Sequence, residues 1–288
     1  MPEAKIGVIG GSGLYEMEGL TGVDEVMVQT PFGEPSDAIV VGDLDGKTIA
    51  FLPRHGRGHR FTPSELPVRA NIYALKSLGV EWVISVNAVG SLKEDVHPLD
   101  IVIPDQLIDR TKSRANSFFD GMGLVAHLPF AEPFCPVLSD ILHRAAVDAG
   151  ASVHKGGTYV VMEGPFFSTK AESKLYRSWG GSIIGMTALP EAKLAREAEM
   201  CYATIACVTD YDTWHETEES VNIEMAVANL QKNVNTARRI IGMAAERIPQ
   251  GRGCVCASAL DSNILTDPQR IPERTKRDLS LLIGKYVK

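Results

Sequence analysis

The sequence predicts an α/β fold. Short apolar runs, typical of buried strands, alternate along the chain with segments whose apolar residues recur at helical spacing. The 288 residues are 44% hydrophobic and 23% charged, with a mean hydropathy of −0.01, which is a globular composition that can bury a large core. Ligands of α/β folds collect at the carboxyl ends of strands, so polar residues that follow strands are the first functional candidates.

The predicted strands are short apolar runs bounded by turn residues. One segment, 38–52, holds two of them, because Asp45-Gly46 divides it at a turn dipeptide. Strands are expected at 5–9, in both halves of 38–52, at 81–88, 100–108, 157–162 and 182–185, and in the run that ends at the sequence TDYD (209–212).

The predicted helices have recognisable signals at their ends. For the first helix, the sequence TPSE (62–65) is a start signal and Gly79 is a stop signal. Helices are expected at 64–78, about 136–149, 168–179, after Pro190, at 219–247 and at 273–287, with an irregular connector at 251–272.

Charge and hydropathy exclude several classes of protein. The net charge of −7 and the pI of about 5.6 argue against a nucleic-acid partner, although a local basic pocket could still bind a small anion. No run reaches the ~20 apolar residues of a membrane span, and no signal peptide follows Met1. We therefore expect a soluble protein of the cytoplasm with no membrane partner.

The cysteines divide into two groups. Cys135, Cys201 and Cys207 lie in apolar or mixed runs and are interpreted as small buried hydrophobic residues. Cys254 and Cys256 are separated by one residue, and they are either a redox or disulfide pair or two free thiols. The second interpretation is favoured.

The Gly-rich turn in VIGGSGL (8–14) follows the first strand, where close backbone approach suits a phosphate and Ser12 would add a hydroxyl. The dinucleotide pattern G-x-G-x-x-G fails because Glu16 stands at its third glycine, and GKT (46–48) lacks the leading glycine of a P-loop. Alone, the motif fits a phosphate site and an ordinary tight turn equally well.

The basic segment PRHGRGHRFTP (53–63) also follows a strand. Arg54 could make a forked contact to phosphate, and a solvated basic loop is the alternative. His55 and His59 have metal-ligand spacing for a helix, but the glycines between them disfavour a helix, so no metal is expected.

Three further strand ends carry small, aromatic or hydroxyl residues. The segment SVNAVGSL (85–92) could turn backbone N–H groups toward a ligand, and the two phenylalanines of VVMEGPFFST (160–169) could stack on a flat base. Met186 and Thr187 end the strand before Pro190, where they could bind a ligand. The alternatives are a plain strand end, two core aromatics and a helix cap, respectively.

The acidic motif TDYD ends the strand IACV (205–208). Asp210 and Asp212 lie on the same side if the strand geometry continues. A carboxylate can accept from an exocyclic amine, and a carboxylic acid can deliver a proton to a ring nitrogen. An acidic loop is the alternative, and no single motif excludes its alternative.

Together the motifs resemble the purine nucleoside phosphorylase family. The motifs GGSG, RHG, NAVGS, MEGPFFST, GMTALPEA and TDYD occur in family order over roughly 5–247. The sequences TPFGEPSD, DQLIDRT, SFFDG and HLPFAEPFCP resemble the branch of the family that cleaves methylthioadenosine. The resemblance implies one nucleoside phosphorylase domain (1–250) with a mixed, barrel-like central sheet flanked by helices, and a connector and C-terminal helix (251–288) packed on it.

The resemblance also implies a reaction: phosphate attacks the anomeric carbon of S-methyl-5′-thioadenosine and releases adenine and 5-methylthioribose 1-phosphate, without a cofactor. An ionised aspartate can only accept, which suits the 6-amino group of adenine better than a 6-oxo group. The resemblance implies that phosphate is bound by Ser12, Arg54, His55, Ala88 and Thr187. It implies that Met186 contacts the ribose, that Phe167 and Asp210 contact the base, and that Asp212 protonates N7. It also implies a homotrimer in which His127 contributes to a neighbouring subunit's 5′ pocket.

Asn87 departs from the family pattern, because the methylthioadenosine branch frequently has threonine there. The runner-up interpretation is a phosphorylase for 6-oxopurine nucleosides or methylthioinosine. A nucleoside hydrolase and a purine-binding protein without catalysis are alternatives from other classes, and both would leave the predicted phosphate ligands or acids without a purpose.

Overall fold

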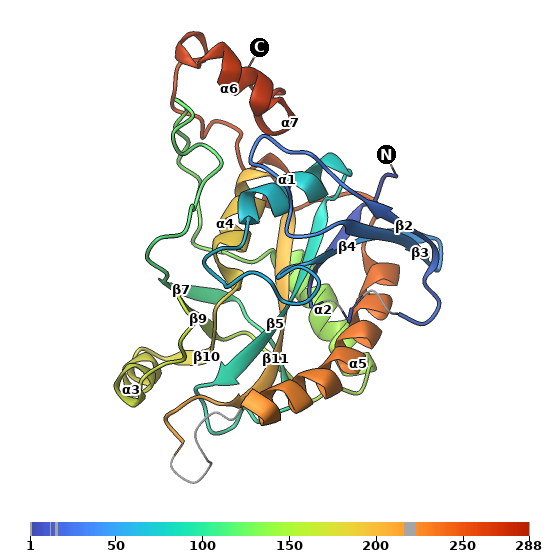
Figure 1. Cartoon of the computed structure of the whole chain (residues 1–288), viewed down its shortest axis with the longest axis vertical. Coiled ribbons are helices and arrows are strands. Elements are labelled where there is room, and N and C mark those ends of the chain that lie inside the picture. The colour runs from blue at the N-terminus through green and yellow to red at the C-terminus, as the bar shows by residue number, and fades with distance from the viewer. Residues whose placement is uncertain (1, 12, 15–16, 216–222, 288) are drawn as a thin grey trace.

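The structure is a computed structural model that describes residues 2–11, 13–14, 17–215 and 223–287 (Figure 1). Within these residues, eleven strands form one sheet. The strands are β1 (Ile6–Gly10), β2 (Thr21–Val26), β3 (Ile39–Leu44), β4 (Lys47–Pro53), β5 (Trp82–Ser91), β6 (Ile101–Ile103), β7 (Gln106–Arg110), β8 (Val153–Lys155), β9 (Thr158–Met162), β10 (Gly181–Gly185) and β11 (Cys201–Tyr211). The helices are α1 (Val68–Ser77), α2 (Pro136–Asp148), α3 (Lys170–Ser178), α4 (Ala188–Glu197), α5 (Ile223–Arg247), α6 (Glu273–Asp278) and α7 (Ser280–Ile283), with 3₁₀ turns η1 (Val255–Ser258) and η2 (Pro268–Arg270).

The sheet branches at β5, which organises the molecule. β5 pairs in parallel with β1 and β11 and antiparallel with β10. β4 is parallel to β1, so the carboxyl ends of β1, β4, β5 and β11 lie toward the same edge of the sheet. Polar residues that follow these strands therefore converge, although they are far apart in the sequence.

Helices cover both faces of the sheet (Figure 1). The α1 and α4 helices contact each other on one face, and α2 and α5 contact each other on the other. Consecutive residues of one strand pack into different core clusters, because their side chains point to opposite faces of the sheet. Ile9 and Val83 belong to the cluster that includes α1 and α4, whereas Val8 and Ile84 belong to the cluster that includes α2 and α5. The predicted mixed sheet with flanking helices is confirmed.

The first helix begins later than predicted, for a local reason. The TPSE start signal forms its contacts, since the Thr62 backbone N–H and hydroxyl donate to Glu65 Oε2 at 3.0 and 2.7 Å. These contacts close a separate turn, and α1 starts only after Pro67, at Val68.

Two other predicted elements are divided. The segment 100–108 is two strands, because Pro104 interrupts it and β6 and β7 then pair with different neighbours. The segment 273–287 is divided into α6 and α7 at Leu279. β2 and β8 were not predicted; β2 lies almost wholly at the surface, so it lacks an alternating pattern.

The C-terminal segment packs on the rest of the fold. Leu279, Leu282 and Ile283 are buried in the same cluster as Ile72 of α1. The helices α6 and α7 lie at the top of the molecule, beside the loop that joins β7 to α2 (Figure 1). No helix among the described residues is long and apolar enough to span a membrane.

Candidate active site

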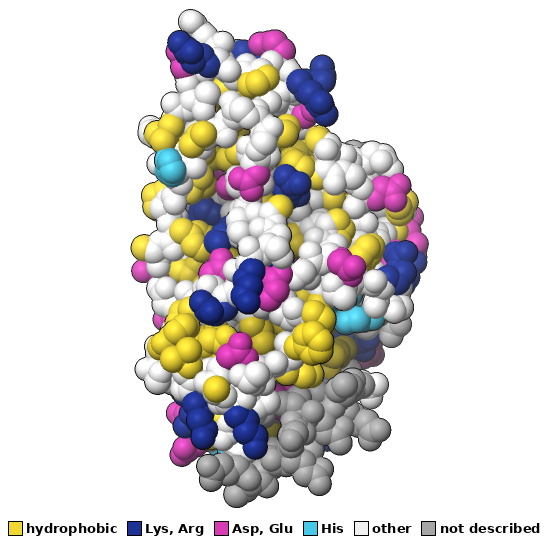
Figure 2. All heavy atoms as spheres, turned by 60° about the vertical axis from the view of Figure 1, so that its left-hand side comes forward, with side chains coloured by type: hydrophobic (Ala, Val, Ile, Leu, Met, Phe, Trp, Pro, Cys, Tyr) yellow, Lys and Arg dark blue, Asp and Glu magenta, His cyan; other side chains and the backbone are white. Residues whose placement is uncertain are grey.

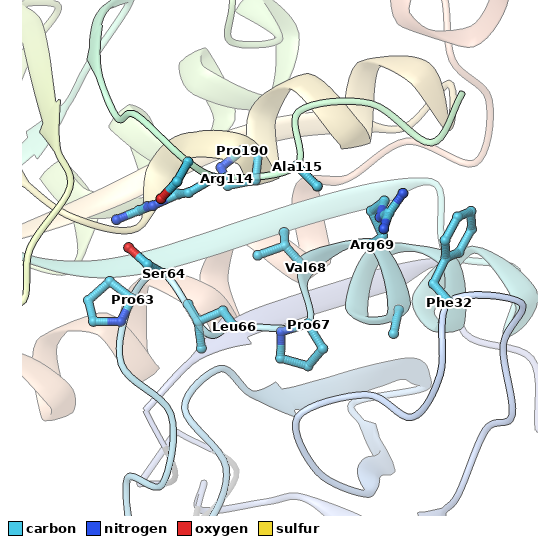
Figure 3. A pocket seen from close by; sticks show the side chains of 12 residues that line it. Phe32, Pro63, Ser64, Leu66, Pro67, Val68, Arg69, Arg114, Ala115 and Pro190 are labelled. Atoms are coloured by element: carbon cyan, nitrogen blue, oxygen red, sulfur yellow. The ribbon is translucent and has the colours of Figure 1, made fainter. Parts of the chain in front are cut away.

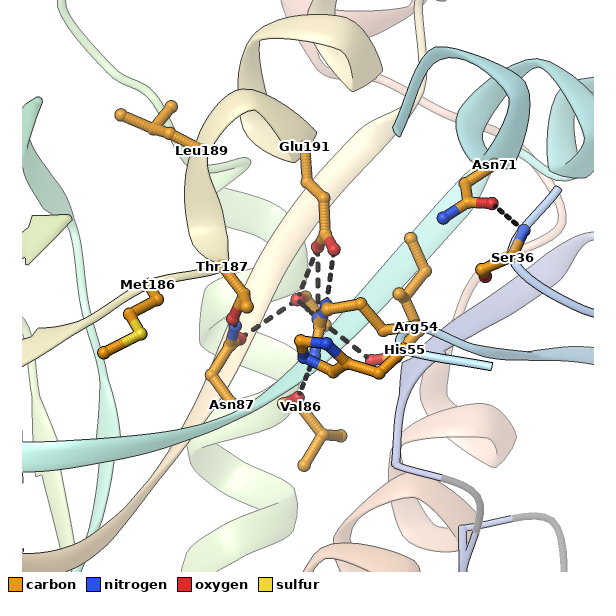
Figure 4. Close-up of polar contacts among 12 residues, drawn as sticks. Ser36, Arg54, His55, Asn71, Val86, Asn87, Met186, Thr187, Leu189 and Glu191 are labelled. Carbon is orange, nitrogen blue, oxygen red and sulfur yellow. Dashed lines mark hydrogen bonds and ion pairs between the residues drawn. The ribbon is translucent and has the colours of Figure 1, made fainter. Parts of the chain in front are cut away.

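Arg54 follows β4 directly and is buried, with 3% of its surface exposed. Its guanidinium donates to Glu191 through Nε at 2.5 Å and through Nη2 at 3.2 Å. Further N–H groups donate to Ser85 Oγ at 2.6 Å and to the Val86 carbonyl at 2.8 Å (Figure 4). Burial acts to lower the pKa of Arg54, but the charge and hydrogen bonds of Glu191, with smaller contributions from Tyr202 and Tyr159, together outweigh it, so the pKa is raised. Arg54 is thus a permanent buried cation locked to the sheet, which the solvated-loop alternative did not foresee.

Glu191, on α4, is a site residue that sequence reasoning missed. Besides Arg54 it accepts hydrogen bonds from Ser85 Oγ at 2.9 Å and Tyr202 Oη at 3.0 Å. A buried carboxylate needs such a full set of donors. It joins α4, β4, β5 and β11 at one point. The only sequence signal for Glu191 was its position after Pro190, in a motif already considered as a site. No sequence pattern pairs it with Arg54, which lies 137 positions away.

Asn87 and Thr187 connect this cluster to the next strand end. Asn87 Nδ2 donates to Thr187 Oγ1, so the hydroxyl proton of Thr187 remains available for another acceptor. Thr187 occupies the N-cap of α4, but its side chain makes no cap hydrogen bond, so the helix-cap alternative is wrong. Ala88 is exposed although its neighbours along β5 are buried, so the sheet backbone is open to a ligand there.

His55 lies beside Arg54 in a neutral form. Its Nδ1 is 2.8 Å from the Phe61 carbonyl, an acceptor, so Nδ1 carries the proton and Nε2 is left as an acceptor. Burial, aided by the charge of Arg54, lowers the pKa of His55 to about 4. The His59 ring stacks on it with centroids 4.2 Å apart.

The TDYD motif lies at a β-bulge. The pairing of β11 with β5 shifts by one residue between Val208 and Asp210, so Asp210 faces Gly90. Asn229 and Asn233 of α5 donate to the carbonyls of Thr209 and Val208 at 2.8 and 3.0 Å, which holds this strand end. The bulge re-aims Asp210 relative to a regular strand.

Both aspartates lie next to Gly90, Asp210 through its carboxylate and Asp212 through its Cβ atom. A Cβ atom at position 90 would lie 3.1 Å from Asp210 Oδ1 and 3.5 Å from Asp212 Cβ. Thr209 Oγ1 lies 2.6 Å from Asp210 Oδ2 and orients that carboxylate. Asp210 lies within β11 and Asp212 is buried directly after it, so the motif is not the solvated acidic loop of the alternative interpretation.

Asp212 is the more deeply buried of the two acids. It is 3% exposed, its backbone N–H donates to the Ser91 carbonyl at 3.0 Å, and its Oδ2 has no hydrogen-bond partner among the described residues. Burial raises the pKa of this carboxyl.

A second buried arginine, also missed in the sequence, fixes the segment that carries Met186. The Arg114 guanidinium donates to the carbonyls of Met186, Leu189, Met162 and Glu163. These four carbonyls belong to the ends of β9 and β10 and to the start of α4. Arg114 thus positions the Met186 and Thr187 strand end against the Arg54 cluster.

Two of the predicted site residues that the structure describes, Phe167 and His127, are not gathered into this cluster. Phe167 is 49% exposed and Phe166 is 86% exposed, so neither is the core aromatic of the alternative interpretation. His127 is exposed on the loop between β7 and α2, where its backbone N–H donates to the Asn263 carbonyl at 3.0 Å. Ser12 lies outside the described residues.

A hollow of about 180 Å³ lies beside this cluster and not at it. Its walls come from the start of α1 and from the strand-connecting segment at Arg114, and Figure 3 shows Ser64 and Val68 facing Arg114 and Pro190 across it. Arg114 borders this hollow, and its guanidinium already donates to four carbonyls.

A buried polar cluster and two acids lie at the carboxyl edge of a mixed sheet, which is the edge where α/β enzymes bind their substrates. A family model described as "Phosphorylase superfamily" matches residues 5–245, so the chain belongs to this superfamily, and the predicted class of enzyme is confirmed.

Curated relatives align over the whole chain. An S-methyl-5′-thioadenosine phosphorylase of Geobacter sulfurreducens is 59% identical, over 99% of this chain and all of the relative. One of Thermosynechococcus vestitus is 56% identical over 99% of both chains. Among solved structures, a methylthioadenosine phosphorylase from an Antarctic soil metagenomic library has a TM-score of 0.94 at 51% identity, covering 98% of this chain and 99% of that one. A Schistosoma mansoni methylthioadenosine phosphorylase in complex with adenine has a TM-score of 0.80 at 36% identity, covering 98% of both. The resemblance to the methylthioadenosine branch is thereby confirmed.

Proposed function

We propose that this chain catalyses the phosphorolysis of S-methyl-5′-thioadenosine to adenine and 5-methylthioribose 1-phosphate. The observation that carries the proposal is the pair of acids next to Gly90, one buried with a raised pKa, at the same sheet edge as the buried ion pair of Arg54 and Glu191. The full-length similarity to relatives named for this reaction supports it.

The proposed phosphate site is the open backbone at Ala88 with the side chains around it. Thr187 has a hydroxyl proton to donate, and neutral His55 offers Nε2 as an acceptor for a protonated phosphate oxygen. The Arg54 guanidinium contributes positive charge to this proposed site, although most of its N–H groups donate to Glu191 and to β5. Ser12 completes the proposed set.

In the proposed base site the two acids have different roles. Asp210, held by Thr209, accepts from the 6-amino group, and Asp212 protonates N7. As phosphate oxygen bonds to the anomeric carbon, the N-glycosidic electrons move into the purine, and the added proton neutralises the leaving base. Met186 and Phe167 are assigned to the ribose and the base.

The test is adenine release from methylthioadenosine, with adenosine and inosine in parallel, each with and without phosphate. We expect phosphate-dependent release, fastest for methylthioadenosine. Faster cleavage of inosine than of methylthioadenosine would overturn the roles proposed for Asp210 and Asp212 and favour a 6-oxopurine phosphorylase. Turnover without phosphate would indicate a hydrolase, and binding without turnover a purine-binding protein.

We propose in addition that the enzyme is a homotrimer in which His127 completes a neighbouring subunit's 5′ pocket. Figure 2 shows hydrophobic side chains gathered on the face that carries α3 and the loop from β7 to α2. Beside His127, Val125 is 51% exposed and Leu265, paired with it, is 62% exposed. Light scattering of the purified chain should give three times the chain mass of 31.2 kDa; a monomer would exclude a shared site.

A further inference from the structure

Four of the five cysteines meet at one place. Cys135 precedes α2, Cys201 begins β11, and Cys254 and Cys256 lie at η1 in the C-terminal connector. The four Sγ atoms all lie within 4.8 Å of one another, and the Cys201 and Cys254 sulfurs are 3.2 Å apart. Cys135, Cys201 and Cys207 are buried as expected, and of these three only Cys207 lies outside the cluster.

The cluster is built on ordered backbone. The Cys135 N–H donates to the Tyr202 carbonyl and the Cys201 N–H to the Glu81 carbonyl, both at 2.8 Å. Cys135, Cys201 and Cys256 are each at most 1% exposed, and only Cys254 is reached in part by solvent.

The adjacent connector is fixed independently of the sulfurs. Arg252 Nε lies 3.2 Å from Glu81 Oε2, and its Nη1 donates to the Glu199 carbonyl. The two cysteines of the connector are thus held against the two cysteines of the core by contacts that do not involve sulfur.

We propose that these four cysteines bind one Zn²⁺ ion as a tetrathiolate structural site. A tetrahedral site with Zn–S bonds of about 2.3 Å needs sulfurs about 3.8 Å apart, which the observed spacing accommodates with small shifts. Four soft thiolates without histidine or carboxylate select zinc over hard cations. Binding releases the four thiol protons, and the N-terminus of α2, where Cys135 occupies the N-cap position, favours the resulting negative charge.

The metal would tie the C-terminal connector to the core of the phosphorylase fold. Cys135, Cys201 and Cys256 are buried in the core cluster that α2 and α5 share, and Cys254 packs against it. Cys254 and Cys256 belong to the connector that follows α5. A disulfide is the competing use of these thiols, since a bond of about 2.05 Å could form between two of them. The two uses differ in metal content and in the number of free thiols.

The experiment is the metal content of the full chain purified under reducing conditions from zinc-supplemented cells. We expect one zinc per chain by elemental analysis, and five titratable thiols after unfolding in the presence of a chelator. Cobalt exchanged into the site should give the intense visible bands of tetrahedral cobalt thiolate. Cys254→Ser should lose most of the zinc and the cobalt bands, whereas the matched control Cys207→Ser, a buried cysteine outside the cluster, should keep both.

Three outcomes would overturn the proposal. One is a metal-free chain whose mass is lower by the hydrogens lost in one or two disulfides. Another is a metal-free chain with all five thiols free after exposure to zinc, and the third is stoichiometric iron in place of zinc. Because zinc content and the cobalt spectrum are measured on the unsubstituted chain, they decide the matter even if Cys254→Ser does not fold.

Discussion

Replacing Asp212 with asparagine lowers kcat for phosphorolysis of methylthioadenosine by about 10²–10⁴-fold, the range expected for loss of a general acid. The asparagine keeps the shape of the side chain but has no acidic proton to give to N7. Asp212 is 3% exposed, and burial raises its pKa, so the protonated form that donates is favoured in this position. Steady-state rates at saturating phosphate measure the effect.

The pH profile separates a proton donor from a residue that only shapes the pocket. With the aspartic acid, kcat should fall as pH rises through the pKa of the acid, because the donor loses its proton. In Asp212→Asn this fall should disappear, leaving a low rate that does not change with pH over that range.

Asp210→Asn is the matched comparison, since Asp210 lies at the same glycine but is held by Thr209. We expect this variant to lose selectivity for adenine over 6-oxopurines, because an amide can donate to a carbonyl, and to lose less in kcat. A near-wild-type kcat in Asp212→Asn together with a collapse in Asp210→Asn would move the acid role to Asp210.

The strand ends of this fold could be predicted from sequence because their signals are local. Arg54, Ala88 and Asp210 each directly follow or end an apolar run, and the structure brings these runs together at one sheet edge. The turn at Asp45-Gly46 could likewise be predicted from the dipeptide, and in the structure both residues adopt the positive φ that such a turn requires.

What sequence reasoning missed depends on contacts between distant segments. Glu191 and Arg114 look like ordinary helix and loop charges until the fold places each against a buried partner. The four-cysteine cluster draws on three segments separated by more than fifty residues, so only its C-x-C pair could be noticed. The bulge before Asp210 is a matter of strand register, which no local pattern specifies.

Glu191→Ala destabilises the protein by about 3–5 kcal/mol, because it leaves the Arg54 guanidinium buried without its counter-charge. The Arg54 and Glu191 side chains are 4% and 2% exposed, so water cannot replace the lost carboxylate. The Tyr202 hydroxyl also loses its acceptor. Urea denaturation at a fixed protein concentration measures the change.

The exposed pair of Arg57 and Glu25 is the control, since their side chains are 39% and 55% exposed. Glu25→Ala removes one partner of an ion pair as Glu191→Ala does, yet it should cost at most about 1 kcal/mol, because solvent screens the arginine that remains. Equal effects of the two substitutions would show that burial does not control the strength of the Arg54 contact.

Glu191→Gln tests the function of the pair if the alanine variant does not fold. The amide retains the shape and one acceptor oxygen but loses the charge that holds the guanidinium at the end of β4. Freed from Glu191, Arg54 can turn toward solvent, and we expect KM for phosphate to rise while KM for methylthioadenosine changes little. An unchanged KM for phosphate would mean that the buried ion pair only supports the fold and that the anion is bound by Thr187, His55 and the open backbone at Ala88.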